Sequence, residues 1–70
     1  MDYIERMKVE LEELRRKAGK LKTALTTLEV TPKEHNLMSI QYFTMVKYIA
    51  ILEERINLAN QLKEVNTNND

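Results

Sequence analysis

Hydrophobic residues recur along the first thirty positions of the chain with the spacing of an α-helix. From Ile4 onward the gaps between them alternate between three and four residues for four heptads. Such a repeat places one apolar stripe along a helix and predicts packing against a partner helix. Asp2, three residues before Glu5, is a typical helix cap, so we expect a helix over about residues 2–29. Its predicted seam comprises Ile4, Met7, Leu11, Leu14, Ala18, Leu21, Leu25 and Leu28.

A break in the helical pattern is predicted at residues 30–31. Thr31 can cap a following helix, Pro32 suits the first helical position, and Glu34 stands at the capping-box position. The residue before a proline is disfavoured in helical conformation, which places the break at Val30–Thr31. A connection of two or three residues requires the two flanking helices to run antiparallel as neighbours.

The second predicted helix runs from residue 32 to about residue 64 and contains the most hydrophobic stretch of the chain, Leu37 to Ile56. Residues 66–70 are polar and lack a core-facing position, so we expect a disordered tail there. The sequence therefore predicts an all-α fold, an antiparallel two-helix hairpin of coiled-coil type within residues 1–65. The second seam comprises Met38, Tyr42, Met45, Ile49, Leu52, Ile56 and Ala59.

Aligning the two seams around the turn predicts which polar residues lie opposite one another. Lys8 then lies across from Glu53, which forms a favourable charge pair. Arg15 lies near Val46 and Lys22 lies near Ser39, so neither cation has an acid opposite it.

The second helix carries hydrophobic residues outside its seam, in contrast to the mostly charged first helix. A helix that is apolar on several sides is buried on several sides, and one hairpin partner cannot cover them all. We therefore expect self-association, as a dimer that forms a four-helix bundle or as a higher closed oligomer. The expected contact stripe is Phe43, Ala50, Ile51 and Leu58.

Composition narrows the function classes. The 70 residues carry 11 basic and 11 acidic side chains, so the zero net charge does not favour long nucleic acid or a membrane surface as a partner. The absence of cysteine excludes disulfides and thiolate metal sites. No apolar run approaches the roughly 20 residues that span a bilayer, and the charged N-terminus does not suit a signal peptide. We expect a cytoplasmic protein without cofactor or metal.

Catalysis has little support in the sequence. His35 is the only histidine, and it lies in the first turn of the second helix, where the helix dipole disfavours a positive charge. No second histidine or cysteine can join it as a metal ligand. The interpretation that His35 is an ordinary, partly exposed side chain outweighs a Ser39–His35 catalytic arrangement, and we expect a non-enzymatic protein.

The main polar feature is a basic run in the first helix, which comprises Arg15, Arg16, Lys17, Lys20 and Lys22. This run has two interpretations. In the first, it is a solvated face whose charge is balanced by neighbouring glutamates. In the second, it is an anion site that suits a small phosphorylated ligand, with the ring of Tyr48 or Tyr3 stacking on a base. The phosphate-binding residues would then be Arg15, Arg16, Lys20 and Lys22.

Three segments of the sequence resemble known phage proteins. RM..E..EL from Arg6 to Leu14, KL at Lys20–Leu21 and M..Y...LEERI from Met45 to Ile56 look like the small two-helix proteins of phage and prophage genomes, including those of crAss-like phages. More distantly, the mid-helix Gly19 with Lys20 is similar to the hairpin domain of phage sponge proteins. The sponges are oligomers that sequester the cyclic-nucleotide signals of bacterial immunity.

The resemblance implies a phage accessory protein that counters host antiviral defence by binding. Its partners would be itself, as a homo-oligomer, and either a host defence protein or a small cyclic nucleotide, within the host cytoplasm. The alternative is a structural coiled-coil adaptor with no small ligand, in which the basic run is solvated.

Overall fold

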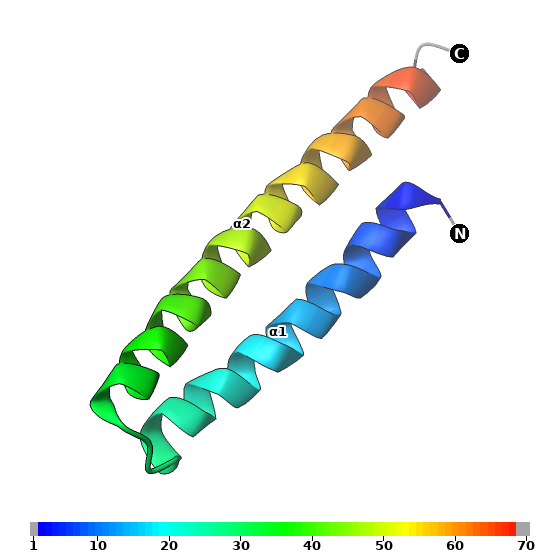
Figure 1. Ribbon diagram of the computed structural model, residues 1–70. Coiled ribbons are helices and arrows are strands. Elements are labelled where there is room, and N and C mark those ends of the chain that lie inside the picture. The colour runs from blue at the N-terminus through cyan, green and yellow to red at the C-terminus, as the bar shows by residue number, and fades with distance from the viewer. Residues whose placement is uncertain (1, 69–70) are drawn as a thin grey trace.

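The protein is a helical hairpin whose two helices lie side by side along most of their length (Figure 1). The computed structural model describes residues 2–68, and the side chains of residues 2–63. Helix α1 spans Tyr3–Thr27 and helix α2 spans Pro32–Asn68. The two helices form a rod 59 Å long, with the start of α1 and the end of α2 toward one end and the connection at the other. The predicted all-α antiparallel hairpin is confirmed.

Capping groups set the start of each helix. The side chain of Asp2 accepts a hydrogen bond from the Glu5 amide (2.9 Å), and Thr31 Oγ1 accepts one from the Glu34 amide (3.2 Å). Each bond satisfies a backbone donor that lacks a partner within the helix. The bond from Glu5 is also the main reason that the pKa of Asp2 lies below its ordinary value. Both caps lie where the sequence predicted them.

The first helix ends earlier than the expected residue 29. Leu28 is extended and caps the helix, with its N–H donating to the Ala24 carbonyl (2.9 Å). Thr26 and Thr27 both donate their hydroxyls to the Thr23 carbonyl in this last turn, a local bonding that weakens a helix. The connection is therefore Leu28–Thr31 rather than residues 30–31.

The predicted seams form the contact between the helices, with one exception. Leu52 is fully buried, and the buried cluster around it lies in the half of the hairpin away from the turn. Leu28 was predicted to lie in the seam, but its side chain is 57% exposed because the helix has ended before it. The cluster comprises Ile4, Met7, Leu11, Leu52, Ile56 and Ala59.

Helix α2 has 37 residues and α1 has 25, so the two cannot match along their whole length. The structure continues α2 to Asn68, past the expected end near residue 64 and into the expected tail of 66–70. Residues 69–70 lie outside the described residues, so disorder stays a prediction for these two residues alone.

Candidate functional site

The basic run of α1 is divided between different sides of the hairpin. Arg15 donates to Glu53 across the helix contact (2.8 Å), whereas the sequence had placed Lys8 opposite Glu53. Lys8 instead pairs with Glu5 on its own helix (3.7 Å). A side chain on a helix leans toward the N-terminus of that helix. Two long side chains on antiparallel helices therefore meet about one turn away from the point at which each residue's own backbone faces the other helix. The predicted lack of an acid near Arg15 is therefore wrong.

Tyr48 forms a hydrogen bond between the helices on the opposite side of the contact between α1 and α2. Its hydroxyl donates to Glu10 Oε1 (2.5 Å). Positions 10 and 15 on α1 are about 140° apart around the helix, and so are positions 48 and 53 on α2. The two interhelical bonds thus flank the buried seam on opposite sides. The ring of Tyr48 cannot share one site with Arg15.

The remaining basic residues of the predicted site also fail to converge. Arg16 and Lys20 are exposed, one turn apart, on the side of α1 away from α2. Lys22 lies near the flank that Arg15 occupies. Among the described residues, no acid forms an ion pair with these three cations. Lys20 is roughly 25 Å along α1 from Tyr3, so these cations and that ring belong to different regions.

The hydrogen bond between Tyr48 and Glu10 raises the pKa of the Tyr48 hydroxyl, with a smaller opposing effect from nearby Arg55. A raised pKa means that the folded state favours the neutral phenol. The stabilisation it gives is complete below the unfolded value of about 10 and is lost as the pH rises through the folded value.

We therefore expect the Tyr48 phenolate to form only above pH 10. The measurement is the phenolate absorbance of the native protein minus that of Tyr48→Phe. Glu10→Gln is the control, because removing the carboxylate should bring the midpoint back toward 10. A Tyr48 midpoint at or below 10 in the native protein would contradict the bond.

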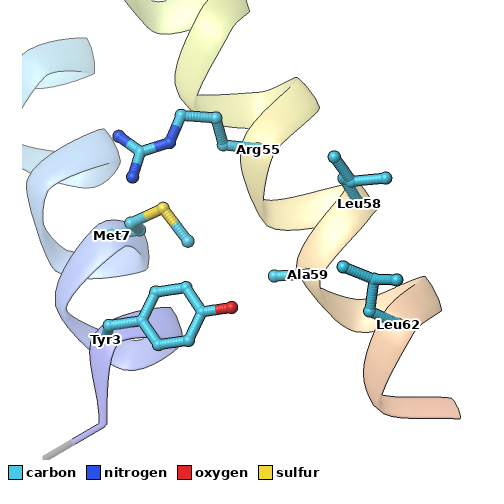
Figure 2. Close-up of a pocket in the computed structure, with 6 residues that line it drawn as sticks. All are labelled: Tyr3, Met7, Arg55, Leu58, Ala59 and Leu62. Atoms are coloured by element: carbon cyan, nitrogen blue, oxygen red, sulfur yellow. The ribbon is translucent and has the colours of Figure 1, made fainter. Parts of the chain in front are cut away.

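A shallow pocket lies at the open end of the hairpin, where sequence reasoning did not predict one. It has a volume of about 170 Å³ and is lined by residues of both helices. Figure 2 shows the Tyr3 ring extending from α1 toward α2 and the Arg55 side chain extending from α2 toward α1. The other lining residues are apolar: Met7, Leu58, Ala59 and Leu62.

Arg55 gives this pocket its chemical character. No carboxylate of the described residues forms an ion pair with its guanidinium. Tyr3 is 53% exposed, so a large part of its surface is open to a ligand. A guanidinium binds phosphate through paired hydrogen bonds, and an aromatic ring stacks on a planar base. The pocket thus combines a cationic donor, a stacking surface and an apolar floor.

The signal for this pocket was present in the sequence. The register that aligns the seams also places Tyr3 opposite Leu58, and Arg55 lies one turn before Leu58. Arg55 was missed because it belongs neither to the seam nor to the basic run. A single cation outside a basic run gives little signal until the opposite helix is placed.

His35 lies at the other end of the hairpin and connects the two helices. Its ring Nε2 lies 3.2 Å from the Leu25 carbonyl oxygen and donates to it. Within residues 2–68, no three His, Cys, Asp or Glu side chains are grouped as metal ligands. Neither described helix combines the length and hydropathy that a bilayer crossing requires.

Comparison with known protein families decides the family. The Sequestin family model matches residues 1–58. The chain belongs to the Sequestin family. This is a phage anti-defence family of the sponge type, whose members bind and sequester. The match supports the resemblance to phage sponges and is not specific to crAss-like phages. No match was found among curated proteins or among solved structures.

Proposed function

We propose that this Sequestin counters host antiviral defence in the host cytoplasm by sequestering a small anionic nucleotide signal in the pocket at the open end of the hairpin. The pairing of Tyr3 with Arg55, which has no ion-pair partner among the described residues, carries the proposal. Arg55 binds a phosphate of the ligand, Tyr3 stacks on a base, and the thioether of Met7 contacts the edge of the base.

The size of the pocket supports a site shared between copies of the chain. Its volume of about 170 Å³ is below the ~300–1,000 Å³ of typical ligand sites. One hairpin therefore covers only part of a cyclic dinucleotide. Homo-oligomerisation would supply the rest of the enclosure.

The test is calorimetric titration of the protein with cyclic di-AMP, followed by a panel of other cyclic mono- and dinucleotides. Replacing Arg55 by glutamine should weaken the affinity for the bound member by about 10- to 100-fold, because it removes a charge-assisted phosphate contact. Lys33→Gln, at the turn end of α2, is the matched control and should bind as the native protein does. Unchanged affinity in Arg55→Gln would refute this site.

Two further variants separate this pocket from the basic-run site. Arg16→Gln and Lys20→Gln should leave the affinity within about twofold if the pocket is the site. If they weaken binding and Arg55→Gln does not, the phosphates are held on the outer side of α1, as the basic run predicted. Arg15 and Tyr48 contribute less in either case, because each already has a bond to an acid on the other helix.

Exposed hydrophobic residues on α2 favour a second candidate function, the binding of a host defence protein without any small ligand. Native mass spectrometry of the protein purified from bacterial cells distinguishes the two. Additional mass of a few hundred daltons per site, roughly that of a nucleotide, supports the sequestered signal. Protein that is free of ligand and binds no member of the panel supports the protein partner.

A further inference from the structure

The side of α2 that faces away from α1 carries large hydrophobic side chains that nothing in one hairpin covers. Measured around the helix axis, these side chains lie about 150° or slightly less from the buried seam. Phe43 is the most exposed of them, with 64% of its surface accessible. We call this surface the outer face of α2, and its apolar members are Ile40, Phe43, Ala50, Ile51 and Leu58.

Two opposite charges lie along the centre of the outer face. Lys47 and Glu54 are both exposed, and neither forms an ion pair within the described residues. They are seven residues apart, which is two turns or about 10.5 Å along the helix. This separation is too long for an ion pair within α2. A charge pair could form only with another molecule.

We infer that a second copy of this chain covers the outer face, with the two α2 helices antiparallel about a two-fold axis between Ala50 and Ile51. Lys47 then faces Glu54 of the second copy, and Glu54 faces its Lys47. Because a two-fold contact repeats every pair, one interface contains two such ion pairs. Charge complementarity thus selects this chain as its own partner.

The apolar residues match in the same register. Phe43 meets Leu58 of the second copy, and Ile51 meets its Ala50, so a large side chain faces a smaller one in these layers. Ile40 lies at the end of the face, opposite Gln61 of the second copy. Alternation of large and small residues is how helix contacts fill space without voids. In each copy, α1 remains packed against the side of α2 that faces away from the second copy. Two α2 helices therefore form the centre of the pair, and an α1 lies outside each.

A parallel arrangement of the same surfaces is disfavoured. It would place Lys47 against Lys47 and Glu54 against Glu54, and like charges across a helix contact are repulsive. The two charges thus set the direction of the pairing. The hydrophobic residues alone would not distinguish the two directions.

This inference extends the self-association that the proposed function uses, but it does not depend on the ligand. Leu58 belongs both to the outer face and to the lining of the pocket, so a second copy would border the pocket. The mass of the assembly tests the pairing, and ligand affinity of Arg55→Gln tests the pocket. A result that contradicts one of the two proposals therefore leaves the test of the other valid.

The test is charge reversal read by analytical ultracentrifugation. The native protein should sediment at twice the chain mass of 8.3 kDa. Lys47→Glu or Glu54→Lys alone should raise the dissociation constant of the dimer at least about tenfold, because two attractive pairs become repulsive. The double reversal should restore the dimer. Lys17→Glu on α1 is the matched control and should sediment as the native protein does.

Three results would overturn the inference: a native protein that is monomeric or an odd-numbered oligomer, single reversals without effect, or a double reversal as dissociated as the singles. Circular dichroism of each variant verifies that the hairpin remains helical. Since the contact does not rely on burial within one hairpin, the single variants should fold as native.

Cysteine cross-linking tests the direction of pairing independently, because the chain has no cysteine of its own. Ala50→Cys lies beside the proposed axis and should be linked rapidly by a short bismaleimide. Leu37→Cys lies roughly 40 Å from its counterpart in an antiparallel pair and should not be linked. Rapid linking of both variants would show parallel helices and overturn the proposal.

Discussion

Replacing Leu52 by alanine is expected to lower the free energy of unfolding by about 2–5 kcal/mol, the cost of removing a buried leucine and leaving a cavity. Leu52 is the one large side chain in the described part of the chain with no exposed surface, and it lies within the cluster that joins the two helices. A domain of 70 residues has a total stability of only about 3.5–10 kcal/mol. The substitution should therefore remove much of the stability of the fold.

Urea unfolding followed by circular dichroism measures this effect, at one fixed protein concentration because association adds to apparent stability. Leu37→Ala is the matched control, since it removes the same atoms from a side chain on the same helix that is 54% exposed. It should change the free energy of unfolding by no more than about 0.5 kcal/mol. Equal effects of the two substitutions would show that the seam does not form the core.

The fold was predictable because burial leaves a repeating pattern in the sequence. Spacing of three and four residues identified both seams, and the structure buries Leu52, a member of the second seam, completely. The turn was predictable because Thr31 and Pro32 favour a helix start for reasons local to the backbone. Leu28 was misplaced because the spacing continued past the point where the helix ends, and spacing alone contains no information on helix termination.

The candidate site was less predictable, since it depends on contacts between residues far apart in the chain. The pairing of Arg15 with Glu53 follows from the lean of two long side chains, which an alignment of seam positions ignores. Arg55 and Tyr3 come together only when the helices pack at the open end. A run of positive charge is visible in a sequence, whereas the absence of an ion pair at Arg55 among the described residues is visible only in a structure.

Replacing Gly19 by alanine is expected to raise the free energy of unfolding by about 1 kcal/mol, because alanine is the better helix former. No atom outside the local helix lies within 4 Å of the position that a Cβ would take at Gly19. For a domain of this size the melting temperature should rise by about 4–8 °C. Ala18→Gly is the control in the opposite direction, because Ala18 is buried in the adjacent position.

The same substitution tests whether Gly19 serves a contact beyond a single hairpin. A mid-helix glycine permits the close approach of another helix or of a ligand. If Gly19 has that role, Gly19→Ala should stabilise the isolated hairpin and yet weaken oligomer formation or nucleotide affinity. If the outer face of α2 and the Arg55 pocket are the functional surfaces, oligomer formation and nucleotide affinity should both remain as in the native protein. A more stable variant with unchanged mass and affinity would place the functional contacts of this Sequestin on α2 and at the open end of the hairpin.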